Sequence, residues 1–197
     1  MSLSINKAAI IGGGVIGGGW AARFLLHGWD VALFAPAPSA VARVHQVIER
    51  AREALKELYD GDAPIEGKLS ICSTLGDAVD GANWIQESTP ERLDIKHQCI
   101  ADIEAAANNT SAIIASSTSG FSPSQVNQNA IAPKRIIVAH PFNPVYLIPL
   151  VELVGDAQTI ARAKPILERL GMKPLHVRKE IDAHIADRLL EAVWREA

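Results

Sequence analysis

The chain has 197 residues, which is enough for one domain of ordinary size or for one domain and the beginning of a second. Hydrophobic residues make up 48% of the sequence and charged residues 21%, so a substantial core can form. The formal net charge of -3 provides no basic surplus that would attract nucleic acid or an anionic membrane surface, and we expect neither as a partner.

Two further features bear on location and redox state. The longest weakly polar run, residues 8–22, contains six glycines and is followed by Arg23, which is typical of neither a signal peptide nor a membrane span. The two cysteines, Cys72 and Cys99, lie far apart and form no CxxC pair. We therefore expect free, buried thiols in a reducing cytoplasm, with no disulfide and no metal site.

The N-terminal segment has the pattern of a strand, a tight turn and a helix. An apolar run, Lys7–Ile11, precedes a cluster of glycines, and apolar side chains from Ile16 to Phe24 then recur at helical spacing. The helix is predicted to end at 27–28, where glycine can supply a left-handed cap, and a buried strand follows at 31–34. A strand, a crossover helix and a second strand form a βαβ unit.

The same alternation continues along the chain. Strands that alternate with helices predict an α/β fold with a Rossmann-type, doubly wound, mainly parallel sheet and helices on both of its faces. Further helices are expected at 39–59, 93–107 and 159–170, and further strands at 69–73, 84–87, 112–115, 135–139, 150–154 and 174–177.

The last segment has a different pattern. From Ile181 onward, Ile185, Leu189 and Val193 recur every four residues, which predicts a helix with an apolar face. Such a helix needs a partner, and the sequence up to Ala197 supplies none. We therefore expect a nucleotide-binding domain at 1–180, with 181–197 as the first helix of a further domain, and the chain as a fragment of a longer protein.

The glycines after the first predicted strand fit the GxGxxG pattern. Gly12 permits a tight turn, Gly14 leaves room for a pyrophosphate to approach the backbone, and Gly17 lets the helix pack closely on the strand. Free N–H groups at the helix start, around Val15 and Ile16, can hold phosphate oxygens. The pattern predicts a dinucleotide site; a turn without a ligand and a methyltransferase-type cofactor site are the alternatives.

The second part of the dinucleotide fingerprint is absent. Ala35 occupies the position at the end of the second strand where an acidic residue would bind the adenosine ribose. Arg43 lies within a helix, where it is poorly placed to bind a 2′-phosphate, and Ser39 could substitute only weakly. NAD remains the expected cofactor, although Ala35 leaves the choice between NAD and NADP open.

Polar residues follow several predicted strands at their carboxyl ends. Glu87 ends one strand, residues 116–119 follow another, and His140 follows a third. In open α/β sheets ligands bind at this edge, so we expect one crevice, with Ser117 beside the cofactor and Ser119 beside the substrate. Taken singly, the serines could be turn or cap residues and the histidine could be structural.

His140 can both accept and donate a proton near neutral pH, which the oxidation of an alcohol by hydride transfer requires. Glu152 interrupts an apolar strand, where an unpaired charge would be costly, and is a candidate to orient the imidazole. The alternative for Glu152 is a surface position on an edge strand. Asn143 and Ser119 are suited to hydrogen-bonding the reacting oxygen.

At these residues the chain resembles the 3-hydroxyacyl-coenzyme A dehydrogenase family over essentially its whole length. The resemblance rests on the stretches GGGVIG, STPERLDIK, SSTSG, HPFNPV, PLVE and IADRLL. It implies that an all-helical, dimer-forming domain follows the nucleotide-binding domain, and hence a homodimer for the intact protein. It also implies His140 as the catalytic base, Glu152 as its partner, Ser119 and Asn143 as substrate contacts, and Glu91 and Lys96 as a pair beside the cofactor.

Within that family the stretch NPVYLIPLVE and the last 27 residues are most similar to the branch that oxidises L-carnitine to 3-dehydrocarnitine with NAD. Asp187 stands where the acyl-coenzyme A enzymes carry an asparagine near the substrate. Tyr146 is the aromatic residue best placed to contact a quaternary ammonium, with core packing as its alternative. The other functions considered are an L-gulonate 3-dehydrogenase, a 3-hydroxyacyl-coenzyme A dehydrogenase and a non-catalytic, crystallin-like dinucleotide-binding protein.

Overall fold

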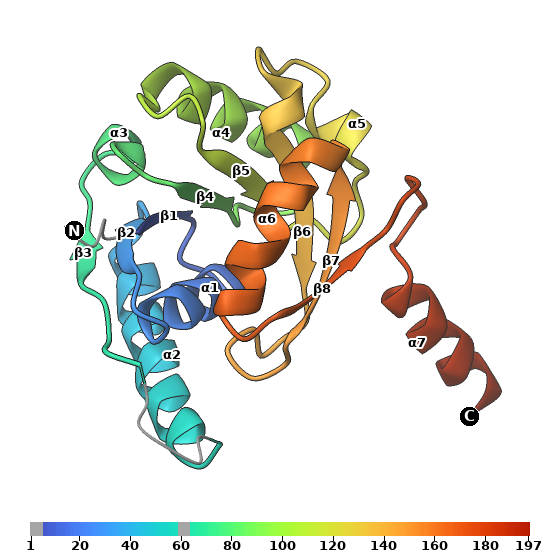
Figure 1. Ribbon diagram of the computed structural model, residues 1–197, viewed down its shortest axis with the longest axis horizontal. Helices are drawn as coiled ribbons and strands as arrows, with labels where there is room; N and C mark the ends of the chain where they lie inside the picture. Colours follow the sequence, from blue (N-terminus) through green and yellow to red (C-terminus); the bar gives the residue numbers. More distant parts are fainter. Residues whose placement is uncertain (1–5, 59–63) are drawn as a thin grey trace.

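The computed structural model describes residues 6–58 and 64–197, and within them eight strands form one sheet (Figure 1). The strand order is β3-β2-β1-β4-β5-β6-β7-β8, with β7 antiparallel to β6 and every other neighbouring pair parallel. The strands are β1 (Lys7–Ile11), β2 (Asp30–Phe34), β3 (Leu69–Ile71), β4 (Trp84–Glu87), β5 (Ile113–Ser116), β6 (Ile136–Pro141), β7 (Leu150–Gly155) and β8 (Lys173–His176). This topology confirms the predicted doubly wound, mainly parallel sheet.

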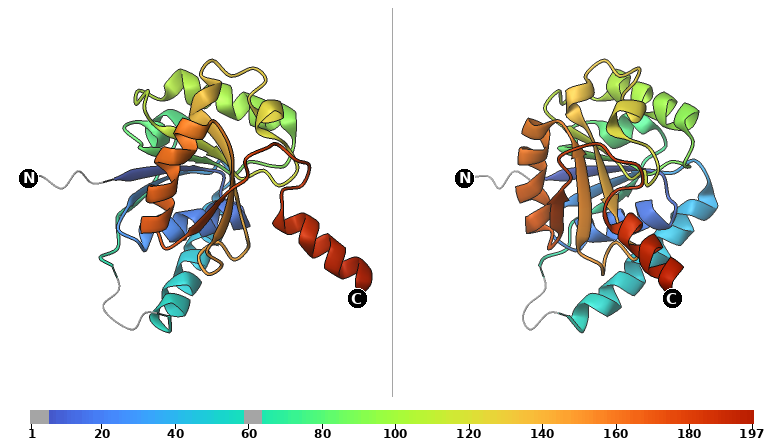
Figure 2. Two further views of the ribbon diagram at one scale, coloured as in Figure 1. Left: turned by 45° about the vertical axis from the view of Figure 1, so that its right-hand side comes forward. Right: turned by 90° about the vertical axis from the view of Figure 1, so that its right-hand side faces the viewer.

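Helices cover both faces of the sheet (Figure 2). Side chains of α1, α2 and α6 belong to one hydrophobic cluster, and side chains of α3, α4 and α5 belong to another. The last helix, α7, projects away from the sheet and has no buried residue. The helices are α1 (Val15–Leu25), α2 (Pro38–Lys56), α3 (Leu75–Val79), α4 (Leu93–Ala106), α5 (Pro123–Val126), α6 (Ala157–Arg169), α7 (Ala186–Glu196) and the 3-10 helix η1 (Pro133–Arg135).

The two hydrophobic clusters explain why the strands read as continuous apolar runs. Successive side chains of a strand point to opposite faces of the sheet. Ile10 and Leu33 accordingly pack under α1 and α2, whereas Ile11 and Ala32 pack under α3 and α4. Because both faces are covered, the central strands alternate between two apolar environments and carry no polar face.

Most predicted elements are confirmed, with ends that differ by one or two residues. The second helix begins at Pro38, one residue before the predicted start, because the fixed φ of proline suits the first turn of a helix. It ends at Lys56, before the predicted end; Tyr59, the predicted last residue, lies outside the described residues. The prediction did not include α3, α5 and η1, which are too short to show a helical period.

The terminal helix begins at Ala186, which corrects the predicted start at 181. Ala183 and His184 adopt positive φ angles of 56° and 51°, and this conformation cannot be part of a right-handed helix. Neither residue is a glycine, so the sequence carries no signal for the interruption. The consequence is that residues 181–185 form a turn, which brings His184 back against the sheet.

The two cysteines differ in their environment. Both thiols are free, but Cys99 is buried and Cys72 is partly exposed, so the prediction of two buried thiols is correct for Cys99 and wrong for Cys72. Burial, with the nearby carboxylates of Glu87 and Asp102, raises the pKa of the Cys99 thiol, which keeps it protonated. Among the described residues, no helix combines the length and apolar character that a membrane span needs, and no cluster of side chains is suited to a metal ion.

The glycines of α1 allow a test of how closely this helix approaches its neighbours. A Cβ at Gly19 would lie 2.8 Å from the Cβ of Val145, whereas a Cβ at Gly18 would lie 3.4 Å from Val47. Gly19→Ala is expected to lower the free energy of unfolding by about 1–2 kcal/mol, since overpacking costs more than helix propensity contributes. Gly18→Ala, the matched control, is expected to raise it by up to about 1 kcal/mol. Urea unfolding measures both, and equal effects would contradict the close approach.

Candidate active site

The glycine-rich turn after β1 has two glycines that the chain itself requires and one that it does not. Gly12 has a φ of 109°, and a Cβ there would lie 2.4 Å from the carbonyl oxygen of Ser88. A Cβ at Gly17 would lie 1.9 Å from the carbonyl oxygen of Gly12. At Gly14 a Cβ would meet no atom within 4 Å, and no side chain caps the start of α1 there. The open backbone at Gly14 and the uncapped helix start together fit a phosphate group.

A cleft of about 1010 Å³ opens beside this turn, between the ends of β1, β2, β4 and β5. Its volume is at the upper end of the range of about 300–1,000 Å³ that small-molecule and cofactor sites occupy. The structure therefore brings most of the predicted cofactor residues to one surface. Those that line the cleft are Gly12, Gly14, Val15, Ile16, Ala35, Glu91, Lys96 and Ser117, together with Ser119.

The wall of the cleft at the end of β2 is apolar. Ala35 lies directly after the strand and packs against the glycine-rich turn. A Cβ added at Gly13 would lie 2.9 Å from the Cβ of Ala35. Among the described residues of β2, α2 and the loop between them, the cleft is lined by no carboxylate, and Arg43 is the charged side chain that reaches it. The described residues on this side of the cleft thus include a cation and no acidic ligand, and Arg43 reaches the cleft although it was expected to be poorly placed within its helix.

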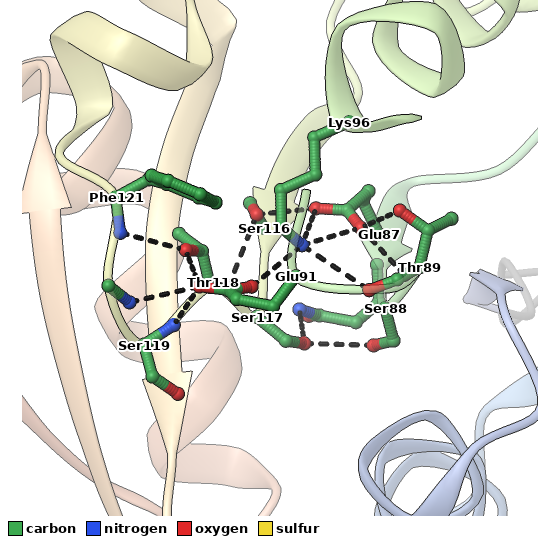
Figure 3. A network of polar contacts seen from close by, with 12 residues as sticks. Glu87, Ser88, Thr89, Glu91, Lys96, Ser116, Ser117, Thr118, Ser119 and Phe121 are labelled. Atoms are coloured by element: carbon green, nitrogen blue, oxygen red, sulfur yellow. Dashed lines mark hydrogen bonds and ion pairs between the residues drawn. The ribbon is translucent and has the colours of Figure 1, made fainter. Parts of the chain in front are cut away.

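A buried polar network fixes the loops after β4 and β5 (Figure 3). Glu87 is fully buried at the end of β4, and both of its carboxylate oxygens lie 3.1 Å from Nζ of Lys96. The N–H of Thr89, at 2.7 Å, and the hydroxyl groups of Thr89 and Ser116 also donate to Glu87. These donors offset the cost of burying the charge. The sequence placed Glu87 at the strand end but did not reveal this role.

Lys96 joins a second carboxylate to the network. Its Nζ lies 3.3 Å from Oε2 of Glu91, so the two residues predicted as a pair are in contact. Oε1 of Glu91 accepts hydrogen bonds from the hydroxyl of Thr118 and from the N–H groups of Ser119, at 3.1 Å, and Gly120, at 3.0 Å. Burial opposes ionisation, but these bonds and the Lys96 ammonium together lower the pKa of Glu91. The loop after β5 is thereby held against the loop after β4.

His140 and Glu152 face each other directly across two neighbouring strands. They are register partners of the antiparallel pair β6 and β7, and Nδ1 of His140 lies 3.3 Å from Oε2 of Glu152. Glu152 is fully buried, which excludes a surface position on an edge strand. Its other oxygen accepts hydrogen bonds from the N–H groups of Ile185, at 2.9 Å, and Ala186, at 3.0 Å. The carboxylate therefore orients the imidazole and holds the start of α7 in place.

Three further side chains surround the imidazole of His140. The ring of His184 stacks on it with a centroid distance of 4.8 Å, and Phe142 meets it at 5.0 Å in an edge-on arrangement. Oδ2 of Asp187 lies 3.6 Å from Nε2 of His140. Of these residues, Asp187 was predicted from the sequence, whereas His184 and Phe142 were not. Only their nearness to Asp187 and His140 in the sequence could have suggested them.

The other predicted substrate residues lie on the loops around this group. Ser119 is exposed on the loop after β5, and Asn143 is exposed on the loop after β6. Tyr146 is half-buried and packs against the hydrophobic core below α1 and α6. This packing agrees with the alternative for Tyr146, a core position, whereas the phenyl ring of Phe142 contacts His140.

His184 lies between His140 and the loop after β5 that lines the cleft. It is buried, and its Nε2 lies 3.4 Å from the carbonyl oxygen of Thr118, the residue between Ser117 and Ser119, which both line the cleft. Its Nδ1 has no hydrogen-bond partner among the described residues. Burial, followed by the charge of His140 when that ring is protonated, lowers the pKa of His184. His184 is therefore neutral at the pH values at which an ordinary histidine begins to protonate.

Comparison with known proteins identifies the family. Residues 7–181 match the family described as 3-hydroxyacyl-CoA dehydrogenase, NAD binding domain. The chain belongs to this family. The match indicates NAD as the cofactor, which favours a dinucleotide over a methyltransferase-type cofactor. The open backbone at Gly14 leaves the space that a pyrophosphate requires.

The chain is similar to longer proteins. It is 59% identical over 197 residues to the L-carnitine dehydrogenase/betainyl-CoA thioesterase of Ruegeria pomeroyi, a match that covers 98% of this chain and 40% of that protein. It is 50% identical to the L-carnitine dehydrogenase of a Pseudomonas species, over 98% of this chain and 61% of that protein. The chain thus spans between about two fifths and three fifths of the length of these relatives.

Solved structures of other dehydrogenases share the fold. The NAD+ dependent dismutase 5-formyl-3-hydroxy-2-methylpyridine 4-carboxylic acid 5-dehydrogenase is 30% identical, with a TM-score of 0.88 over 98% of this chain and 63% of that chain. The (S)-3-hydroxybutyryl-CoA dehydrogenase of Ralstonia eutropha is 22% identical, with a TM-score of 0.84 over 98% of this chain and 70% of that chain. At this lower identity the likeness establishes the fold alone.

Gly14 provides a test of the NAD site that separates binding from stability. Because a Cβ at Gly14 meets no atom of the chain, Gly14→Ala is expected to change the free energy of unfolding by less than about 1 kcal/mol. It is expected to weaken NADH binding on the order of tenfold to a hundredfold, since the methyl group occupies the space of the pyrophosphate. NADH fluorescence titration measures the affinity, and urea unfolding measures the stability.

Gly17→Ala is the contrasting variant, because its Cβ would collide with the carbonyl oxygen of Gly12 and destabilise the fold itself. Unchanged NADH affinity in Gly14→Ala would show that the pyrophosphate binds elsewhere.

The lowered pKa of His184 predicts a pH dependence of stability. The folded protein binds fewer protons at this residue than the unfolded chain does, so stability decreases as the pH falls through 6.5, the unfolded value, toward the lower folded value. His184→Phe keeps the aromatic ring and removes the titration. The loss of unfolding free energy between about pH 8 and about pH 5.5 is therefore expected to be smaller in His184→Phe than in the unmodified protein.

Urea unfolding at the two pH values measures this difference. His45→Phe is the control, because His45 is exposed on α2 and away from the site. An equal pH dependence in His184→Phe and in the unmodified protein would rule out a neutral, buried His184.

Proposed function

We propose that the protein oxidises L-carnitine to 3-dehydrocarnitine with NAD as the hydride acceptor. The observation that carries this proposal is the buried His140–Glu152 pair on β6 and β7, next to β5, whose following loop lines the cleft. The chain's 59% identity to a relative named L-carnitine dehydrogenase/betainyl-CoA thioesterase supports the choice of substrate.

His140 acts as the base in this proposal. An ionised Glu152 can only accept hydrogen bonds, so its contact with Nδ1 places the ring proton there and leaves the lone pair on Nε2. Nε2 then takes the proton of the substrate hydroxyl as the adjoining carbon gives up its hydride. The imidazolium that forms lies between Glu152, at 3.3 Å, and Asp187, at 3.6 Å, and both carboxylates stabilise its charge.

The cofactor supplies a hydride acceptor when it is bound, and residues of the chain hold it in the cleft. In the proposal the turn at Gly14 and the start of α1 hold the pyrophosphate, and Ser117 and the Glu91–Lys96 pair contact the nicotinamide half. The network around Glu87 keeps these groups in place, because it ties Lys96 to the ends of β4 and β5. Positioning of this kind lowers the entropy cost of reaching the reactive geometry.

The loops after β5 and β6 provide the groups that orient the substrate. We assign Ser119 and Asn143 to the reacting oxygen, because both are polar, exposed and located on loops next to the His140 group. A quaternary ammonium is commonly held over an aromatic face. Phe142 is in contact with His140, so it is better placed for this role than Tyr146, which packs against the core.

We also propose that 181–197 begins a helical, dimer-forming domain of a cytoplasmic protein. On α7 the side chains of Leu189, Val193 and Trp194 are 64%, 63% and 69% exposed, which leaves an apolar face that requires a partner. The greater length of the relatives is consistent with a further domain. The free thiols of Cys72 and Cys99 fit a reducing compartment.

His140→Gln tests the proposed base. In the protein at its natural length, the variant is expected to lower kcat/KM for L-carnitine on the order of a hundredfold to ten-thousandfold, because glutamine cannot take the proton. NADH affinity should remain, since His140 does not line the cofactor cleft. His97→Gln, at a partly exposed histidine of α4, is the matched control. Unchanged turnover in His140→Gln would remove it as the base.

Turnover assays with three substrates test the choice of substrate. L-carnitine, L-gulonate and a 3-hydroxyacyl-coenzyme A are each supplied with NAD, and NADH formation is measured. Activity with L-carnitine alone, or at least a hundredfold preference for it, is the expected result. Activity confined to either of the other two would replace the proposed substrate, and NADH binding without any turnover would favour a non-catalytic protein.

A further inference from the structure

Asp187 is a carboxylate to which no group among the described residues donates a hydrogen bond, apart from its contact with His140. It lies in the first turn of α7, where an acidic side chain often accepts hydrogen bonds from the free N–H groups of the helix start. Here the N–H groups of Ile185 and Ala186 donate to Glu152 instead. The guanidinium of the next residue, Arg188, is directed to the carbonyl oxygen of Asp182, at 3.5 Å. Among the described residues the ion-pair partner of Asp187 is His140.

That partner cannot neutralise Asp187 when the site is ready to bind an alcohol. His140 then carries its ring proton on Nδ1, toward Glu152, and presents a lone pair on Nε2. Oδ2 of Asp187 lies 3.6 Å from Nε2 of His140, so the carboxylate oxygen and the lone pair of the imidazole face each other. A carboxylate in that position, with only 33% of its side-chain surface exposed, requires a positive group close by.

We propose that Asp187 determines the specificity of the site for a cationic substrate by pairing with the quaternary ammonium. This inference rests on the proposed function, because it assumes that the substrate hydroxyl binds at Nε2 of His140. In carnitine only two carbon atoms separate the hydroxyl oxygen from the ammonium nitrogen. A hydroxyl held at Nε2 therefore brings the ammonium next to the carboxylate that lies beside the same nitrogen.

The pairing has two effects on selectivity. The ammonium neutralises Asp187, so a cationic substrate relieves the repulsion between the carboxylate and the lone pair of His140. A neutral substrate of the same shape must bury part of the carboxylate without compensation. Glu152 cannot play this part, because both of its oxygens already accept hydrogen bonds from the chain. The positive charge of the substrate is thus recognised by Asp187 and its orientation by His140.

The experiment compares two substrates that differ only in charge. L-carnitine is matched with 3-hydroxy-5,5-dimethylhexanoate, in which a carbon atom replaces the ammonium nitrogen. Asp187→Asn keeps the size of the side chain and removes its charge. Glu191→Gln is the matched control, because Glu191 lies on the same helix but is 55% exposed and pairs with Arg195. The kcat/KM of each substrate is measured with NAD in the protein at its natural length.

Asp187→Asn is expected to lower kcat/KM for L-carnitine on the order of tenfold to a hundredfold, the effect of losing one nearby, partly screened charge pair. For the neutral analogue, kcat/KM of Asp187→Asn should change by less than about threefold or should increase. Glu191→Gln should alter neither substrate. An equal loss on both substrates, or no loss on either, would overturn the role of Asp187 while leaving the proposed function intact. Failure of the unmodified protein to oxidise L-carnitine would overturn both.

Discussion

The buried carboxylate of Glu152 is the constraint on which the site depends. It has no contact with water, so its charge must be satisfied by the chain. One oxygen faces Nδ1 of His140, and the other accepts the N–H groups of Ile185 and Ala186. The same requirement therefore orients the imidazole and attaches the start of α7 to the sheet. Asp187 and His184 reach His140 only because this attachment holds their segment in place.

A second buried carboxylate performs a comparable task on the cofactor side. Glu87 gathers Lys96 and the polar groups at the ends of β4 and β5, and Lys96 in turn contacts Glu91. The loops that line the cleft are thus held by charge-assisted hydrogen bonds, which are roughly twice as strong as hydrogen bonds between neutral groups. Glu87 lies at the carboxyl end of β4, and Glu152 on β7 faces His140 near the carboxyl end of β6. The two networks adjoin at Thr118, whose carbonyl faces His184 and whose hydroxyl donates to Glu91.

Much of the fold could be predicted because it follows from local patterns. Apolar runs such as Ile136–Pro141 indicate strands that are buried on both faces of a sheet. A polar residue inside such a run, or at its end, needs a hydrogen-bond or ion-pair partner. His140 and Glu152 could be predicted on this basis, and the structure places them in register. His184 could not be predicted, because it reaches the site through a turn with positive φ angles at two residues that are not glycines.

Local patterns in the sequence predicted most of the strands and helices, the glycine-rich turn after the first strand, and the polar residues that follow several strands at one edge of the sheet. Each of these depends on periodicity or on steric limits within a few neighbouring residues. Tertiary structure alone decided which nitrogen of His140 faces Glu152 and which faces Asp187. The contact with Asp187 depends on the turn before α7, which lies more than forty residues after His140. Hydrogen bonds from Ile185 and Ala186 to the buried carboxylate of Glu152 hold this turn in place, and the local sequence does not encode them.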